Sequence, residues 1–220
     1  MNPTKKTARI VAVLLLLTII IGILINQFLQ GPIIFSKDFL TKVSANSNQI
    51  IFSTILGIAA GAIGVGITVI LLPIFKQYKG LSYLYFGFSI IAFAIILIDN
   101  AIILSILTLS QENVKAEAST TGYLESLGTV LYQTRWWTHY TTLLISGLPL
   151  FMFYYLFFLS NLIPRFISVW GLIGVLMLFT EVLLSFFGQG IGMILFLPLG
   201  LVQIIMVVWL LIKGFNTDKS

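Results

Sequence analysis

The chain has 220 residues, of which 59% are hydrophobic and 9% are charged, and its mean hydropathy is +1.08. Soluble proteins carry about 25% charged residues, so this composition excludes an ordinary soluble domain and predicts a membrane protein. The formal net charge is +5, but no run of lysine and arginine is long enough to follow a nucleic-acid backbone, which excludes nucleic acid as a partner.

Six apolar stretches are long enough to cross a bilayer as helices, because a helical span needs about 20 apolar residues. In chain order they cover residues 10–28, 49–75, 81–109, 137–159, 166–187 and 191–212. They are continuously apolar and lack the alternation of a membrane β-strand. The sequence therefore predicts an all-α membrane protein, a six-transmembrane-helix bundle that forms a single domain over residues 1–220.

Lysine and arginine divide unequally between the two sides of this bundle. With the N-terminus inside, the inner side holds eight, namely Lys5, Lys6, Arg9, Lys76, Lys79, Arg165, Lys213 and Lys219. The outer side holds four, namely Lys37, Lys42, Lys115 and Arg135. Cytoplasmic loops carry the excess of positive charge, so the pattern predicts a plasma-membrane protein with both termini in the cytoplasm.

Two connections on the outer side are long enough to have structure of their own. Residues 30–48 are partly apolar, and part of them is expected to lie along the interface as a short amphipathic helix. Residues 110–135 begin polar and then become amphipathic at helical spacing. Their second half either runs into the fourth span or lies as a lid across its outer mouth.

The second span carries a stripe of small side chains on one helical face. Its members are Ser53, Gly57, Gly61, Gly64 and Thr68, at spacings of four, four, three and four. Side chains this small allow another helix to approach closely. The stripe predicts helix packing through Gly57, Gly61 and Gly64, and a pore lining is the alternative.

Two carboxyl groups, Asp99 and Glu181, lie deep within the third and fifth apolar stretches. A charge at this depth costs at least a few kcal/mol, so it is expected to have a partner or a water-filled cavity. Arg135 and His139, the only histidine, share one face at the outer end of the fourth span. Glu181 shares a face of its own helix with Ser185, which follows four residues later.

Counted along their helices at about 1.5 Å per residue, these groups all fall in the outer half of the bilayer. The sequence therefore predicts a polar pocket that opens outward and is bounded by the third, fourth and fifth spans. Its candidate ligand- or ion-binding residues are Glu181, Asp99, His139, Arg135, Asn100 and Ser185. Alternatively, either carboxyl group is neutral and donates one hydrogen bond to a nearby carbonyl in a structural role.

The residue inventory excludes several kinds of chemistry. One histidine cannot supply both axial ligands of a b-type haem or a two-histidine zinc site, and cysteine is absent. No glycine-rich phosphate loop, metalloprotease motif or serine elbow is present. No metal and no cofactor are expected. Acid–base catalysis by Glu181 with His139 is conceivable, but no nucleophile accompanies them, so an intramembrane enzyme is a minor hypothesis.

Several segments together are similar to one family over nearly the whole chain. They are residues 5–10 (Lys-Lys-Thr-Ala-Arg-Ile), residues 162–165 (Leu-Ile-Pro-Arg), Glu181, and residues 209–214 (Trp-Leu-Leu-Ile-Lys-Gly). The chain resembles the bacterial integral-membrane family known as domain of unknown function 4386. The resemblance implies a six-span helical membrane protein of the bacterial inner membrane and brings no activity with it.

The resemblance also bears on individual positions. An acidic residue tends to occur in that family where Glu181 lies, which favours a shared site over an incidental hydrogen bond. Members often carry an acid near the position of Gln203 and an arginine in the third span, where this chain has Ser89. The charge-paired interior of the family is therefore not implied for this chain.

The leading functional hypothesis is a multi-pass membrane protein that binds or transports a small solute or ion in the outward-facing pocket. The alternative is a non-catalytic accessory subunit or membrane scaffold that acts through helix–helix association. The glycine stripe of the second span motivates this alternative. Its partner would be another membrane protein or a second copy of the chain, within the lipid bilayer.

Overall fold

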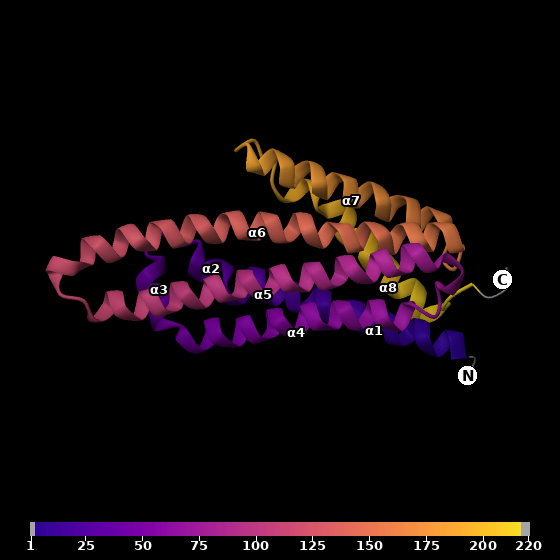
Figure 1. The fold of residues 1–220 in the computed structure, drawn as a ribbon, viewed down its shortest axis with the longest axis horizontal. Helices are drawn as coiled ribbons and strands as arrows, with labels where there is room; N and C mark the ends of the chain where they lie inside the picture. The colour runs from indigo at the N-terminus through magenta and orange to yellow at the C-terminus, as the bar shows by residue number, and fades with distance from the viewer. Residues whose placement is uncertain (1–2, 217–220) are drawn as a thin grey trace.

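Helices account for nearly all of residues 3–216, the part of the chain that this computed structural model describes (Figure 1). In order they are α1 (Pro3–Ile23), the π-helix η1 (Leu24–Leu29), α2 (Gly31–Ile34), α3 (Phe39–Ala45), α4 (Ser47–Leu71), the 3₁₀-helix η2 (Lys76–Tyr78), α5 (Lys79–Lys115), α6 (Ala118–Ser160), α7 (Arg165–Phe186), the 3₁₀-helix η3 (Met193–Leu195) and α8 (Leu197–Ile212). The prediction of an all-α protein is confirmed over these residues. Lys219, one of the charges assigned to the inner side, lies outside them.

Six segments are long and apolar enough to cross a membrane. They are Lys5–Ile34, Ser47–Leu71, Lys76–Lys115, Gly122–Ser160, Arg165–Phe186 and Met193–Ile212. Each contains most or all of one predicted span, so the prediction of six long apolar helices is confirmed. α5 and α6, which contain the third and fourth spans, are much longer than predicted, because their polar ends near residues 110–135 continue as helix instead of becoming loops.

The α5–α6 hairpin extends well beyond the other helices (Figure 1). α5 has 37 residues and α6 has 43. At about 1.5 Å per residue each exceeds the roughly 30 Å hydrocarbon core of a bilayer by more than about 20 Å. Of the two alternatives for residues 110–135, the structure shows the one in which the second half runs into the fourth span, since α6 is continuous from Ala118 to Ser160.

The connection between the first two spans packs onto the bundle. Ile33 and Ile34 of α2 and Val43 of α3 are buried in one cluster with Ile50 of α4 and Ile103 of α5. A short helix was predicted within residues 30–48, and α3 is such a helix. Its apolar residues are covered by neighbouring helices, because the projecting ends of α5 and α6 offer an apolar surface there.

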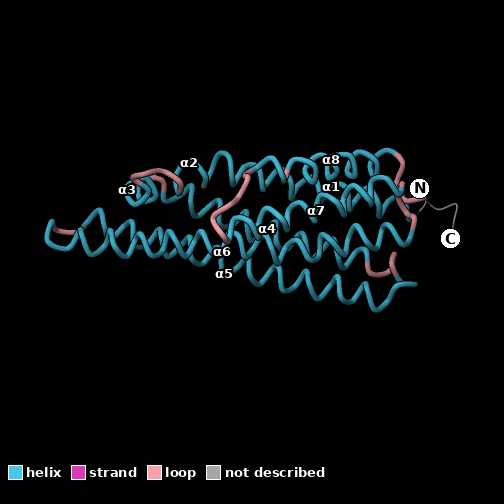
Figure 2. The backbone as a smooth tube through the Cα atoms, turned by 90° about the horizontal axis from the view of Figure 1, so that it is seen from above, coloured by secondary structure: helices cyan, strands magenta, loops and turns pink. Residues whose placement is uncertain are grey.

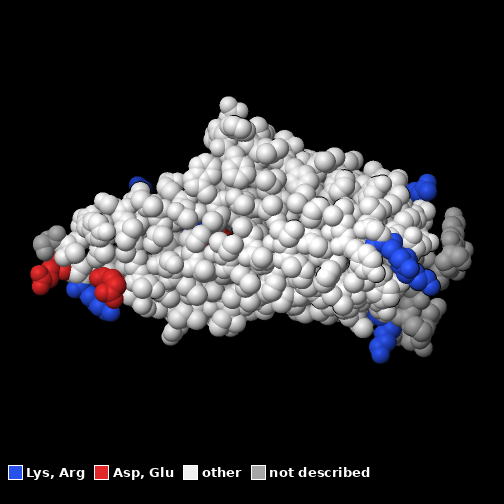
Figure 3. Space-filling model, in the orientation of Figure 1, with Lys and Arg blue, Asp and Glu red and all other residues white. Residues whose placement is uncertain are grey.

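The opposite end of the bundle brings together the start and the end of the described chain. Arg9 donates a hydrogen bond from Nε to the carbonyl of Leu211 at 3.2 Å, and Tyr78 donates one to the carbonyl of Leu159 at 2.8 Å. On the face drawn in Figure 3, lysine and arginine gather at this end, whereas acidic and basic side chains mix at the hairpin tip. The long flanks between the two ends are almost uncharged.

α7 and α8 cover only the part of the α5–α6 hairpin that lies nearer to the start and end of the described chain (Figure 1). Their connection turns part-way along the molecule, as the loop segment midway in Figure 2 shows. Trp137 of α6 stacks on Phe186 at the end of α7, with ring centroids 5.8 Å apart. About 19 residues of α6, or roughly 28 Å, lie beyond that level. The part of the bundle beyond that level is therefore built from the first four spans.

The small-residue stripe lies on α4 and faces α5 over part of its length. A Cβ at Gly57 would lie 3.1 Å from Oδ1 of Asn100, and one at Gly61 would lie 2.7 Å from a ring carbon of Phe93. Both glycines therefore allow α5 to pack closely. All three glycines line a cavity, and a Cβ at Gly64 would have no atom within 4 Å.

Candidate functional site

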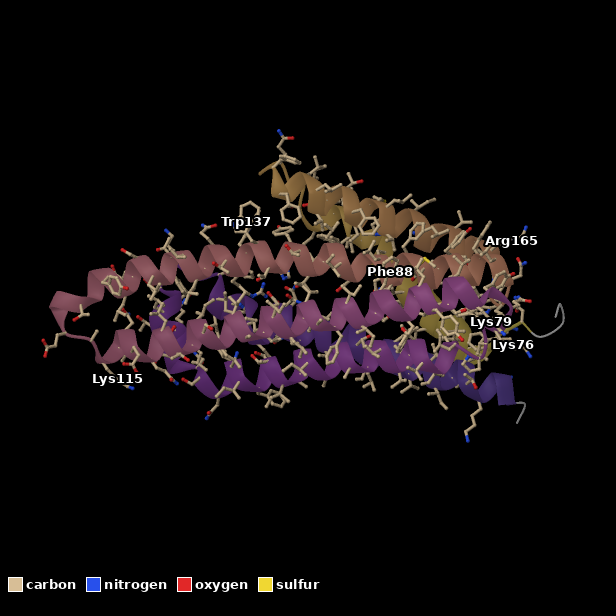
Figure 4. All side chains as sticks on the ribbon, in the orientation of Figure 1. Lys76, Lys79, Phe88, Lys115, Trp137 and Arg165 are labelled. Atoms are coloured by element: carbon tan, nitrogen blue, oxygen red, sulfur yellow. The ribbon has the colours of Figure 1, made fainter. Side chains whose placement is uncertain are left out.

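A cavity of about 380 Å³ runs through the described bundle between α1, η1, α4, α5 and α6, with one residue, Gln203, from α8. Its polar lining comprises Thr18, Asn26, Gln30, Ser89, Asp99, Asn100, Arg135, His139, Ser146 and Gln203. Figure 4 shows nitrogen and oxygen atoms gathered between α5 and α6 at about the level of Trp137. The cavity is thus polar near this level and surrounded by long apolar helices.

Asp99 finds its counter-charge on the facing helix. Oδ1 of Asp99 lies 3.2 Å from Nη1 of Arg135, and Thr138 donates a hydrogen bond to the same oxygen at 2.9 Å. Arg135 and Thr138 are three residues apart on α6, so one turn of helix presents both to α5. Asp99 and Arg135 are 8% and 6% exposed, which makes this a buried ion pair.

Arg135 retains hydrogen-bonding capacity that the described protein does not use. Its Nε and Nη1 are buried and have no hydrogen-bond partner, since the ion-pair contact is not aligned as a hydrogen bond. A guanidinium group carries five N–H donors, and a buried donor without an acceptor is costly. Both nitrogen atoms have almost no accessible surface, so they are enclosed by protein beside Asp99 and do not face the open space of the cavity.

Other groups on the same walls add to the polar surface. Asn100 donates to the carbonyl of Ile96 at 2.8 Å, and its amide lies beside Gly57. Ser146 lines the cavity from α6, and its buried hydroxyl has no partner among the described contacts. The polar face of α6 predicted from sequence therefore points into the bundle.

A second, smaller pocket of about 120 Å³ adjoins the first. It is lined by Phe35, Tyr132, Arg135, Trp136, His139 and Tyr140. Arg135 and His139 line both spaces, so they stand between the central cavity and the aromatic residues beneath α2. His139 also packs edge-on against Tyr140, with ring centroids 5.7 Å apart.

Glu181 lies outside the central cavity, and its carboxylate accepts hydrogen bonds from the loop that follows its own helix. It is 1% exposed and accepts hydrogen bonds from the backbone N–H of Ile191 at 2.9 Å and of Gly192 at 2.8 Å. Ser185 donates a third hydrogen bond at 3.2 Å. Gly190 sits directly on these groups, because a Cβ there would collide with Ser185 and Glu181. The carboxylate therefore holds the connection between α7 and α8.

The structure thus divides the six predicted site residues into two groups. Asp99, Asn100, Arg135 and His139 line the central cavity, whereas Glu181 and Ser185 do not line it. The predicted walls were the third, fourth and fifth spans, but no described residue of α7, the fifth, contributes to the lining. The reason is the return of residues 187–192 over Glu181, which turns that polar face toward its own loop.

Sequence reasoning missed the contributions of the first and last spans to the cavity. Thr18 and Asn26 of the first span and Gln203 of α8 belong to the lining. Polar residues at helical spacing, Thr18 and then Asn26 two turns later, were a signal that could have placed the first span at the site. No group of three or more histidine and acidic side chains suited to a metal ion occurs among residues 3–216.

Replacing Glu181 by Gln is expected to destabilise the fold by about 1–3 kcal/mol, because the amide nitrogen cannot accept from a loop N–H. Thermal unfolding of the detergent-solubilised protein measures this loss. Ser185→Ala is the matched control, since it leaves both backbone donors on the carboxylate, and its loss is expected to be smaller. Equal midpoints for Glu181→Gln and wild type would show that the loop does not depend on this carboxylate.

Replacing Arg135 by Met is expected to cost about 3–5 kcal/mol, because it leaves the buried Asp99 without its counter-charge. The double variant Asp99→Asn/Arg135→Met removes both charges and is expected to recover more than half of that loss. The free energy of unfolding, measured in mixed micelles with an increasing fraction of denaturing detergent, tests this recovery. A double variant no more stable than Arg135→Met alone would contradict the pairing.

Comparison with known proteins places the chain in a family. No curated protein and no solved structure matches it. The family model described as "Domain of unknown function (DUF4386)" matches residues 10–214, which include most of the first long apolar segment, all of the other five and both polar sites. The earlier resemblance is confirmed: the chain belongs to the DUF4386 family.

Proposed function

We propose that this protein is a multi-pass protein of the bacterial plasma membrane that binds a small solute in its central cavity. The observation that carries this proposal is the central cavity itself, which Asp99, Arg135 and His139 line at one level inside an otherwise largely apolar bundle. The cavity volume of about 380 Å³ lies within the range of small-molecule sites.

The second pocket supports a route between the cavity and the outer end of the bundle. Arg135 and His139 line both spaces, so a solute that moves between them passes these two side chains. A bare ion fits the lining less well, because most of it is apolar, including Phe93, Leu150 and Phe153. Binding of a solute, with movement past Arg135 as its extension to transport, is therefore the function that this geometry favours.

The glycine stripe of the second span, which motivated the alternative role as an accessory subunit or scaffold, does not support that role. Gly57 and Gly61 are already occupied by Asn100 and Phe93 of the same chain, so this part of the stripe is not free for a partner helix. Gly57, Gly61 and Gly64 all line the central cavity of the same chain. The stripe therefore supports packing within the chain.

We infer that the end of the bundle with α1's start and α8's end faces the cytoplasm. Lysine and arginine gather there on the face drawn in Figure 3, and the positive-inside rule assigns such an end to the cytoplasm. The chain has no cysteine, so single-cysteine variants can report each side without background.

A membrane-impermeant maleimide is expected to label Glu112→Cys, near the hairpin tip, in intact cells. It is expected to label Lys76→Cys, at the opposite end, only after permeabilisation. Both native side chains are exposed, so accessibility to the reagent depends on the membrane and not on burial. Labelling of Lys76→Cys in intact cells would reverse the orientation.

The cavity itself is tested by filling it. Gly64→Leu places an isobutyl group in the cavity, whereas Gly66→Leu adds the same group to α4 outside the described lining. Neither glycine has an atom within 4 Å of an added Cβ. Native mass spectrometry of protein purified in a steroid-based detergent is expected to show a non-covalent small-molecule adduct in wild type and Gly66→Leu but not in Gly64→Leu. Equal occupancy in all three would contradict binding in this cavity.

A further inference from the structure

The end of the bundle that contains the start of α1 and the end of α8 carries a concentration of positive charge. Its exposed cations are Lys5, Lys6, Arg9, Lys76, Lys79, Arg165 and Lys213. The acidic side chains of residues 3–216 all lie elsewhere in the bundle, namely Asp38, Asp99, Glu112, Glu117, Glu125 and Glu181. A surface with charges of a single sign attracts ions of the opposite sign, so this end favours an anionic partner.

Three of these cations come together where α1 lies against the end of α8. Arg9 donates a hydrogen bond from Nε to the carbonyl of Leu211 at 3.2 Å. The side chain of Lys5 lies against Gly214, since a Cβ there would be 3.2 Å from Cγ of Lys5. Lys213 lies between these two contact points in the sequence, at the C-cap of α8. We call Lys5, Arg9 and Lys213 the α1–α8 basic cluster.

The backbone that carries Lys213 is fixed on both sides. Before it, α8 is held by the hydrogen bond from Arg9. After it, the chain turns at Gly214, whose φ of 78° suits glycine. Phe215 is then 6% exposed, and the N–H of Asn216 donates to the carbonyl of Leu162 at 2.8 Å. Because this backbone is already ordered, a ligand of Lys213 does not have to order it on binding.

An exposed apolar surface begins directly beside the cluster. Its members are Val13, Leu17 and Ile20 on α1, and Ile204, Val208 and Ile212 on α8. The three on α1 continue the helical face of Lys5 and Arg9, at spacings of three and four residues. A ligand that covers both the cluster and this surface has an anionic head and hydrocarbon chains. Arginine binds phosphate through paired hydrogen bonds, and lysine binds it as a point charge.

From the fixed cluster and the apolar surface beside it, we propose that the α1–α8 basic cluster binds the phosphate of an anionic phospholipid. The acyl chains of this lipid lie along the exposed apolar residues of α1 and α8. Phosphatidylglycerol has this chemistry, whereas the choline group of phosphatidylcholine neutralises the same phosphate. The site lies on the surface of the bundle and does not depend on the central cavity.

Native mass spectrometry of the detergent-solubilised protein tests this site by titration with dioleoyl phosphatidylglycerol or dioleoyl phosphatidylcholine. The measured quantity is the Kd of the first bound lipid. Lys5→Gln/Lys213→Gln removes two cations from the cluster and keeps Arg9, which holds α1 against α8. Lys76→Gln/Lys79→Gln is the matched control, because it removes the same charge from the same end (Figure 4). All four lysines are exposed, so both variants are expected to unfold at the wild-type temperature.

Wild type is expected to bind phosphatidylglycerol at least about fivefold more tightly than phosphatidylcholine. The Kd for phosphatidylglycerol is expected to rise at least about fivefold in Lys5→Gln/Lys213→Gln and less than about twofold in the control. Equal rises in the two variants would show attraction to the whole end and overturn the site. Equal affinity of wild type for the two lipids would overturn it as well. Displacement of phosphatidylglycerol by the same concentration of glycerol 3-phosphate would show that the ligand is a soluble phosphate and not a lipid.

Discussion

The buried ion pair between Asp99 and Arg135 is the interaction on which the site depends. Two charges inside an apolar bundle are tolerated because they lie 3.2 Å apart on facing helices. The pair fixes α5 against α6 at one level, and it uses only part of what Arg135 can donate. The same contact that makes the charges tolerable also places both residues on the wall of the central cavity.

Two carboxyl groups that look alike in the sequence are stabilised in different ways. Asp99 is balanced by a cation from another helix, whereas Glu181 is held by two backbone N–H groups and one hydroxyl. A carboxylate that accepts only from a loop fixes that loop, and it has no unpartnered donor beside it. The contrast separates a carboxylate that fixes a loop from one that lines the central cavity.

The sequence was sufficient for the six apolar helices, because length and continuous hydrophobicity determine a span without reference to its neighbours. It also placed Arg135 and His139 on one face, since helical spacing is a local property. It could not determine which helices meet. Whether the face of Glu181 points to another span or to its own loop depends on how residues 187–192 turn, and their apolar and glycine-rich sequence does not specify that path.

The length of α5 and α6 was missed for a related reason, because a polar helix end is stabilised only by the helix beside it.

The stripe on α4 shows how one sequence pattern produces both close packing and a cavity. At Gly57 and Gly61 the facing residues of α5 are Asn100 and Phe93, which fill the space left by the missing side chains. Further inward, Thr68 and Ser89 come close enough to share a hydrogen bond of 2.8 Å, so the two helices are in contact again. Gly64 lies between these two contacts and meets no side chain. Because the helices are held on either side of Gly64, the gap there cannot close by a simple approach of α4 to α5, and the cavity persists as a property of the packing around it.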